Sequence, residues 1–302
     1  MARWFSRKAT STGPALALAV SADGKVAISA SFDKSLKVWD VDSGRERRTL
    51  QGHTGWVLGV AVSADGKVAV SASFDKSLKV WDVESGQERR TLQGHTSSVN
   101  GVAMSADGKM AVSASNDQTL KVWDVESGRE QRTLQGHTGW VRGVAVSADG
   151  KVAISASSDG TLKVWNVESG QEQRTLQGQP SSVNGVAVSA DGKLAVSVSS
   201  DQKLKAWDVE NGRERRTLQG LTYGLHGVAV NADGKLAVSV SPDQTLKVWD
   251  VENGTCLATF FCDDPTICCA MSAGVIATGD AGGRVYLLAL EQEKSARRGR
   301  AP

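Results

Sequence analysis

The chain is built from a repeat, and one copy of it, from Gln51 to Leu92, reads QGHTGWVLGVAVSADGKVAVSASFDKSLKVWDVESGQERRTL. Most of its residues return in the same order from Gln93 to Leu134. A seventh copy, shorter and diverged, extends from Asp263 to Leu290 and carries Leu288 at the tryptophan position. The period is 42 residues, and it is marked by Trp39, Trp81, Trp123, Trp165, Trp207 and Trp249. A fixed period of this length indicates an array of stacked units.

Each copy contains four short segments with the pattern of β-strands. The runs VLGVAVS, KVAVSAS and SLKVWDV alternate in polarity and are rich in valine, and the polar run ERRTLQG follows them. Turn residues separate the segments at Asp65-Gly66, at Asp75 to Ser77 and at Glu84 to Gly86. Such a sheet cannot bury both of its faces alone, so we expect the copies to stack into a closed ring without helices.

Composition excludes several classes of protein. The 302 residues include 40% hydrophobic and 23% charged residues, which is typical of a soluble globular protein. No stretch approaches the roughly 20 apolar residues of a membrane-spanning helix. The net charge of +2 lacks the basic excess of a duplex-binding domain. We therefore expect neither a membrane nor a nucleic acid as partner.

Cysteine usage favours a reducing compartment. Cys256, Cys262, Cys268 and Cys269 all lie near the C-terminal end, so we expect a cytoplasmic protein. Neighbouring strand residues point to opposite faces and no histidine lies nearby in sequence, so buried thiols are favoured over a zinc site. The basic residues before the apolar run from Ala15 to Val20 imitate a secretory signal, but the same run recurs 42 residues later inside the repeats.

The repeats resemble the WD-repeat family of β-propellers, through Gly52-His53, the turn at Asp75 and Trp81-Asp82 in that order. The resemblance spans almost the whole chain and implies a seven-bladed ring of bacterial type with a central channel. The last copy, GDAGGRVYLLAL, is also similar to the closing blade of propellers at the C-terminus of bacterial multidomain signalling proteins.

The ends of the chain predict how the ring closes. The seventh copy lacks a fourth strand, and a shift of one period places residues 3–8 in that position, paired with the strand from Arg284 to Leu290. We therefore predict an all-β fold: a seven-bladed β-propeller of four-stranded antiparallel blades, closed by the N-terminal strand in the last blade. Residues 1–290 would form this single domain, and residues 291–302 a basic, disordered tail.

Three copies contain the residue types of a nucleophilic triad. In the family, the matching His, Ser or Thr, Asp and Trp form a hydrogen-bonded tetrad in each blade, and Ser73 is an alternative hydroxyl to Ser71. An enzyme needs one such site with a cleft, whereas repetition favours a structural network. The resemblance assigns this role to His53, Ser71, Asp75 and Trp81, to His95, Ser113, Asp117 and Trp123, and to His137, Ser155, Asp159 and Trp165. Elsewhere the histidine position holds Ser11, Gln179, Leu221 and Asp263.

Alternating strand direction divides the ring into two faces. The first-to-second and third-to-fourth turns share one end of each blade, which we call the turn face. The second-to-third turns and the links between blades share the other end, the loop face. On the turn face SADGK recurs in five copies and becomes NADGK at Asn231, whereas most differences between neighbouring copies fall on the loop face.

The variable loop-face positions carry residues that commonly anchor protein interfaces. In the family, matching positions commonly contact partners. We expect Phe32, Trp56, Leu58 and Phe74 to come together on two blades, with Trp140 and Arg142 as a second contact. Alternatively, Trp56 and Trp140 pack over neighbouring blades. The predicted protein-binding residues are Phe32, Trp56, Leu58, Phe74, Asn100, Asn116, Trp140, Arg142, Asn184 and His226.

These observations predict a non-enzymatic scaffold, without cofactor or metal, that binds a protein or peptide through its loop face. The arginines of the fourth strands, such as Arg47 and Arg89, favour a solvated rim over a phosphate-binding girdle. We expect a monomer. The alternative function is a sensor that recognises a ligand at the central channel, within a larger bacterial signalling assembly.

Overall fold

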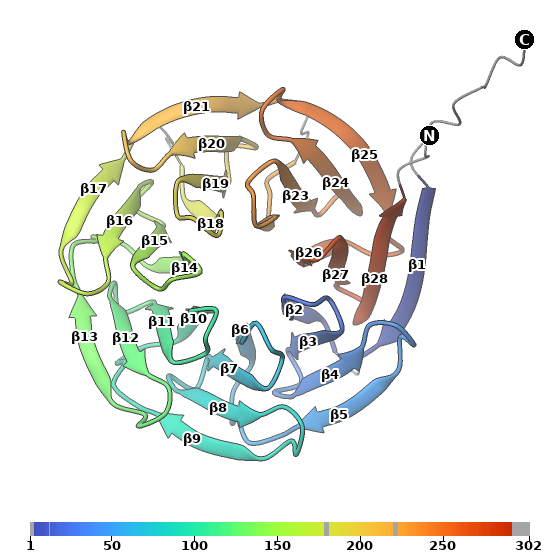
Figure 1. Ribbon diagram of the computed structural model, residues 1–302, viewed down its shortest axis with the longest axis horizontal. Coiled ribbons are helices and arrows are strands. Elements are labelled where there is room, and N and C mark those ends of the chain that lie inside the picture. The colour runs from blue at the N-terminus through green and yellow to red at the C-terminus, as the bar shows by residue number, and fades with distance from the viewer. Residues whose placement is uncertain (1–2, 12, 178–180, 220–222, 292–302) are drawn as a thin grey trace, which may run out of the picture.

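A computed structural model describes residues 3–11, 13–177, 181–219 and 223–291. Within these residues the chain forms seven four-stranded antiparallel sheets and no helix. The sheets are arranged as blades around a central axis (Figure 1). The predicted fold class, a seven-bladed β-propeller closed by its N-terminal strand, is confirmed.

The blades follow the repeats, and strands within each blade run from the channel to the rim in chain order, except in blade 7. Blades 1 to 3 contain β2 (Ala15–Val20), β3 (Val26–Ser31), β4 (Leu36–Asp40) and β5 (Glu46–Leu50); β6 (Val57–Val62), β7 (Val68–Ser73), β8 (Leu78–Asp82) and β9 (Glu88–Leu92); and β10 (Val99–Met104), β11 (Met110–Ser115), β12 (Leu120–Asp124) and β13 (Glu130–Leu134). Blades 4 and 5 contain β14 (Val141–Val146), β15 (Val152–Ser157), β16 (Leu162–Asn166) and β17 (Glu172–Leu176); and β18 (Val183–Val188), β19 (Leu194–Ser199), β20 (Leu204–Asp208) and β21 (Arg213–Leu218). Blade 6 contains β22 (Gly227–Val230), β23 (Leu236–Ser241), β24 (Thr245–Asp250) and β25 (Thr255–Phe261), and blade 7 contains β26 (Thr266–Ser272), β27 (Val275–Asp280), β28 (Arg284–Glu291) and β1 (Arg3–Thr10).

The hydrophobic core lies between the blades. Trp81 of blade 2 is 1% exposed and belongs to one cluster with Ile28 and Leu36 of blade 1. The same arrangement recurs with Trp123, which packs with Val70 and Leu78 of blade 2. Each blade thus buries its apolar side chains against its neighbour, which explains why one copy of the repeat cannot fold alone.

Backbone hydrogen bonds join the SADGK turns of neighbouring blades into an arc on the turn face. In blades 1 to 5, the amide of the alanine in this turn donates to the carbonyl of the matching alanine in the next blade, at 2.9–3.1 Å. The participating alanines are Ala22, Ala64, Ala106, Ala148, Ala190 and Ala232. A turn that must bond to its copy on the next blade has little freedom to vary, which accounts for the uniform turn face.

The N-terminal strand closes the ring. β1 pairs antiparallel with β28 from Arg3 opposite Glu291 to Thr10 opposite Arg284, so the pairing extends two residues beyond the expected 3–8. An ion pair between Lys8 and Asp263, at 2.8 Å, adds a side-chain contact across this junction. The first and last strands of the chain, β1 and β28, therefore lie side by side in blade 7 (Figure 1).

Two expectations concern the ends of the chain. The prediction of a disordered tail over residues 291–302 is wrong at its first residue, because Glu291 belongs to β28 and pairs with Arg3. Residues 292–302 lie outside the described residues, so disorder there stays a prediction. The apolar run that imitates a secretory signal forms β2, the innermost strand of blade 1. In the part of the chain that the structure describes, no helix has the length and apolar character needed to cross a membrane.

Candidate functional site

Polar tetrads support the loop face from within blades 2 to 4. In blade 2, the His53 ring contacts the Asp75 carboxylate through Nδ1 at 2.8 Å and the Ser71 hydroxyl through Nε2 at 2.7 Å. The Trp81 indole donates to the same hydroxyl at 2.8 Å. Because an indole N–H can only donate, the Ser71 hydroxyl is free to donate to Nε2, and Nδ1–H then donates to the carboxylate. In this arrangement both ring nitrogens of His53 are hydrogen-bonded while the imidazole is neutral.

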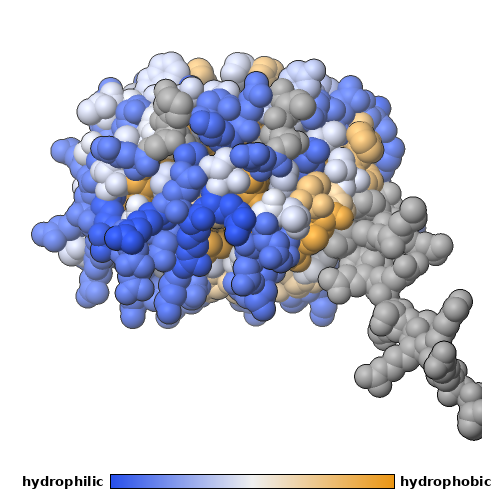
Figure 2. Space-filling model, turned by 90° about the horizontal axis from the view of Figure 1, so that it is seen from above, coloured by the Kyte–Doolittle hydropathy of each residue, from blue (hydrophilic) through white to orange (hydrophobic). Residues whose placement is uncertain are grey.

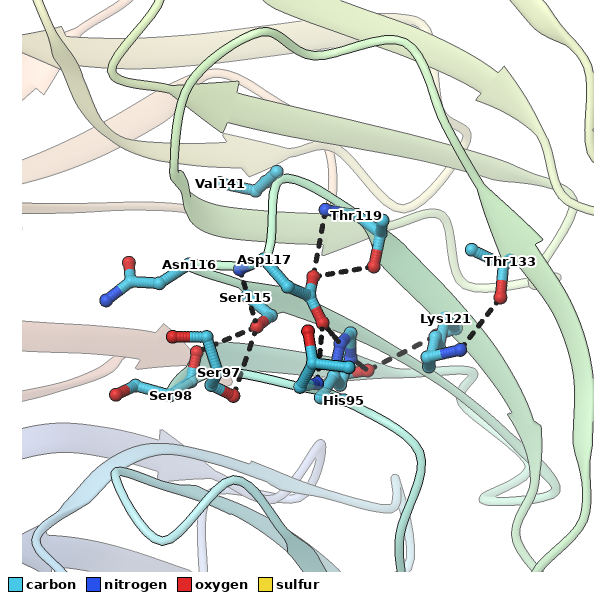
Figure 3. A network of polar contacts seen from close by, with 12 residues as sticks. His95, Ser97, Ser98, Ser115, Asn116, Asp117, Thr119, Lys121, Thr133 and Val141 are labelled. Carbon is cyan, nitrogen blue, oxygen red and sulfur yellow. Dashed lines mark hydrogen bonds and ion pairs between the residues drawn. The ribbon is translucent and has the colours of Figure 1, made fainter.

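The same network recurs in blades 3 and 4. His95 lies 2.7 Å from Asp117 (Figure 3). It also lies 2.7 Å from Ser113, and Trp123 donates to Ser113 at 2.8 Å. In blade 4, the atoms of His137, Ser155, Asp159 and Trp165 repeat these contacts at 2.7–2.8 Å. The four residue types in each copy therefore lie in mutual contact, as the resemblance implied for the family.

The tetrad carboxylates keep their charge because of their hydrogen bonds. Burial acts to raise the pKa of Asp159, but hydrogen bonds from Thr161 and His137 outweigh it and lower this pKa to about 2. The same opposition, with His53 and Ser77 as donors, holds the pKa of Asp75 below its ordinary value. Burial lowers the pKa of His137, which favours the neutral ring.

Burial argues against catalysis at these sites. Ser71, Ser113 and Ser155 are each 0% exposed, and each hydroxyl is already engaged by a histidine and a tryptophan. A nucleophile needs access to its substrate. The alternative hydroxyl, Ser73, donates instead to the Gly55 carbonyl at 3.2 Å and thus fixes the loop before β6.

The remaining blades replace the tetrad in different ways. Blade 1 keeps the indole-to-hydroxyl bond from Trp39 to Ser29, at 2.9 Å, while the buried Ser11 hydroxyl has no partner among the described residues. Gln179 and Leu221, at the histidine positions of blades 5 and 6, lie outside the described residues.

Blade 7 uses another network in the same place. The backbone amide of Asp263 donates to the Tyr286 hydroxyl at 3.0 Å, and this hydroxyl donates to the Asp280 carboxylate at 3.1 Å. Asp280 also accepts from the backbone amide of Arg284 at 2.8 Å. Because Asp263 also pairs with Lys8, this network connects the seventh blade to the strand that closes the ring.

Three aromatic side chains meet on the loop face of blades 1 and 2. The rings of Phe32 and Trp56 stack with centroids 4.1 Å apart, and the rings of Trp56 and Phe74 lie 5.2 Å apart. Their exposed fractions remain 43% for Phe32, 39% for Trp56 and 51% for Phe74. We call Phe32, Trp56 and Phe74 the aromatic patch. Trp56 thus contacts a neighbouring blade, as the packing alternative supposed, and still presents surface to solvent.

A second aromatic stands two blades away. Trp140 is 52% exposed, and the Arg142 guanidinium lies 5.8 Å from its ring. Tyr223, which is not among the predicted binding residues, is 55% exposed in the link between blades 5 and 6. Its position directly before Gly224, a variable link position, was the available signal.

A bulge in the innermost strand directs side chains toward the channel. In blade 2 the register shifts between Val57 and Gly59, which leaves Leu58 as the extra residue. Gly59 is required there because a Cβ atom would lie 2.9 Å from the Cα of Gly101. The structure therefore places Leu58 in the channel mouth and not in the aromatic patch.

The channel mouth on the loop face is a cavity of about 580 Å³. Blades 1, 2 and 7 contribute apolar side chains to it, and blades 3 to 6 contribute polar ones. Asn100 is held in place because its amide donates to Asn116 at 2.6 Å and to the Val141 carbonyl at 2.8 Å. The lining residues are Leu16, Leu58, Asn100, Arg142, Asn184, Ser200, His226 and Ile267.

The cysteines lie in blades 6 and 7. Cys262 and Cys268 are buried, Cys269 is half-buried and Cys256 is exposed, all as free thiols. Burial raises the pKa of Cys262 and of Cys269 to about 12, so these thiols stay protonated. Across the described residues, no group of three or more His, Cys, Asp or Glu side chains is placed to hold a metal ion.

Comparison with known proteins addresses the family. The family model described as "WD domain, G-beta repeat" matches residues 6–40, 44–82, 86–124, 128–166, 170–208 and 212–250. The chain is also similar to the fungal proteins named nuclear distribution protein PAC1, with 64% identity in Arthroderma otae and 61% in Arthroderma benhamiae. These two similarities each cover 33 residues, 11% of this chain and 7% of the relative. Since the family model covers more than half of the sequence, the chain belongs to the WD40 repeat family.

Proposed function

We propose that this protein is a non-enzymatic scaffold that binds a protein or peptide through the aromatic patch on its loop face. The observation that carries the proposal is the contact among three rings, from two blades, that remain 39–51% exposed. Clustered aromatic side chains of this kind are typical anchors of protein interfaces. The family is consistent with this role, because WD40 propellers typically bind proteins or peptides.

The fold does not require these rings, which supports a functional reading. Blade 3 has Ser98 and Asn116 where blade 2 has Trp56 and Phe74, and both blades form the same four strands. The loop hydrogen bond is also the same, since the Phe74 amide donates to the Trp56 carbonyl and the Asn116 amide to the Ser98 carbonyl, each at 2.9 Å. Trp140 and Arg142 would add a second contact on blade 4.

A capture experiment tests the proposal. The full chain is immobilised, and proteins retained from an extract of the native host are compared with those retained by Trp56→Ala and Phe74→Ala. We expect at least one specifically retained protein to be lost with both variants. Asp65→Ala on the turn face is the matched control and should retain it. Equal retention by all correctly folded variants would remove the aromatic patch from the account.

The channel mouth favours a second candidate, a sensor in a larger bacterial signalling assembly. Its cavity of about 580 Å³ combines the apolar Leu16, Leu58 and Ile267 with Arg142, so it could hold a small ligand that carries a negative charge. Thermal unfolding with a panel of small carboxylates tests this candidate. A stabilising ligand whose effect disappears in Arg142→Ala supports it, and no stabilisation by any member contradicts it for this class of ligand.

A further inference from the structure

The outer strand of blade 6 differs from every other outer strand of the ring. In blades 1 to 5 this strand carries both glutamate and arginine, as in ERRTL of β9 and RERRTL of β21, and β1 in blade 7 also carries basic residues. β25 reads TCLATFF and contains no charged residue. In repeat alignment, Arg215 is replaced by Leu257 and Gln219 by Phe261. Charges on an edge strand prevent pairing with other chains, so β25 lacks that protection.

This strand also exposes apolar surface. Phe261 is 73% exposed and Leu257 is 47% exposed, whereas Phe260 is half-buried and packs against Tyr286 with ring centroids 5.7 Å apart. In the view from above Figure 1, a hydrophobic area interrupts the hydrophilic rim (Figure 2). The side chains that alternate along β25 are thus divided between the contact with blade 7 and solvent.

Among the described residues, no strand pairs with the outer edge of β25. β25 is the last strand of its sheet, and the Cys262 amide donates to the Gln244 carbonyl of blade 6 at 2.8 Å. Backbone N–H and C=O groups alternate in direction along an antiparallel strand, so those of Phe260 also point toward β24. The backbone groups of Thr259 and Phe261 therefore point outward, where another strand could pair with them.

We propose that a second copy of this chain pairs antiparallel with β25 to form a two-fold symmetric dimer. The strand is complementary to itself about Thr259, because the exposed Phe261 lies two residues to one side and the exposed Leu257, the extra residue of the bulge between Cys256 and Ala258, lies to the other. A two-fold axis at Thr259 brings the bulged Leu257 of each copy alongside Phe261 of the other, while Thr259 faces its own copy. The absence of charge means that this pairing brings no like charges together.

The chain's own residues 292–302 are a poorer occupant of this edge. They read QEKSARRGRAP, with no large apolar side chain to cover Leu257 and Phe261. The dimer replaces the sequence-based expectation of a monomer with a specific interface. Because β25 lies on the rim, both loop faces stay open, so a dimer would present two copies of the aromatic patch to partners.

Sedimentation of the full chain over a range of concentrations tests the dimer. We expect a shift from monomer to dimer as concentration rises, abolished in the double variant Leu257→Arg with Phe261→Gln, which restores the residues of blade 5. Phe74→Ala removes an exposed ring elsewhere and should leave the shift unchanged. A monomer at every concentration, larger aggregates without a dimer, or a dimer equally strong in the double variant would each overturn the proposal.

Cross-linking tests the register in a way that does not depend on the double variant folding. In a Cys256→Ser background, Thr259→Cys should form a disulfide between two chains on mild oxidation, because paired strands bring these Cα atoms to about 5.5 Å. Thr217→Cys, at the same position of the charged strand β21, is the control. Equal cross-linking at both positions, or none at position 259, would contradict the two-fold pairing.

Discussion

Blades 2 and 3 have the same interior and different loops. His53, with its partners, and His95, with its partners, make matching hydrogen bonds to within 0.1 Å. On the loop face, however, Trp56 and Phe74 are replaced by Ser98 and Asn116, and the polar pair Asn100–Asn116 takes the place of the ring contact. This difference indicates that the tetrads and turns maintain the blade, whereas the exposed loop residues are free to serve binding.

The largest expected effect comes from opening the ring to which both blades belong. Deletion of residues 2–9 removes most of β1 and exposes the edge of β28, so we expect the free energy of unfolding to fall by several kcal/mol, on the order of the burial lost with one strand. Denaturant unfolding of the truncated and full chains measures this change. A truncated chain as stable as the full one would refute closure through β1.

The tetrads should contribute equally in the two blades. His53→Ala and His95→Ala each leave a half-buried carboxylate and a buried hydroxyl without their histidine partner, so each should cost about 1–3 kcal/mol of unfolding free energy. His226→Ala removes an exposed histidine outside any tetrad and is the control. Unequal losses in blades 2 and 3 would show that the loops contribute to the stability of the blade.

The lowered pKa of a tetrad carboxylate predicts that the folded chain loses stability in acid. The pKa of Asp159 is lowered to about 2 in the folded chain, so its contribution is present above the unfolded value of roughly 3.9 and is lost as pH falls toward 2. Wild type should therefore exceed Asp159→Asn in stability at about pH 5, and the difference should shrink by about pH 2. Thermal unfolding at both values measures it, and a difference that is constant with pH contradicts the assignment.

Exchange of the loops should have the smallest effect on stability. Trp56→Ser with Phe74→Asn gives blade 2 the residues of blade 3, and surface substitutions of this kind usually change the unfolding free energy by less than about 0.5 kcal/mol each. Thermal unfolding of the double variant checks this expectation. A loss of several kcal/mol would assign Trp56 and Phe74 to packing.

Much of this architecture could be predicted because the same strand and turn pattern recurs in every clear copy of the repeat. The period of the tryptophans and the turns at Asp65 and Asp75 were sufficient to predict the blades. The missing fourth strand of the seventh copy predicted how the ring closes. Leu58 was placed with the aromatic patch because it is a variable loop-face position close to Trp56 in sequence, but the bulge at this residue directs it to the channel mouth. No repeated pattern marks such a bulge apart from the following glycine.

The seventh blade was the least predictable region. Tyr286 and Asp280 replace the tetrad through residues that have no counterpart in the other copies, so comparison among repeats could not find them. A search for features shared among the copies also misses the exposed edge of β25, because this strand differs by the absence of charged residues. Both cases show that the copies which depart from the repeat must be read residue by residue.

The most direct test of the proposed function is the affinity of a partner obtained by capture, measured for wild type and for Trp56→Ser with Phe74→Asn. We expect this exchange to weaken binding by about tenfold or more, since loss of an interface anchor costs at least about 1.4 kcal/mol, while the folded state is retained. Unchanged affinity in the folded double variant would contradict it.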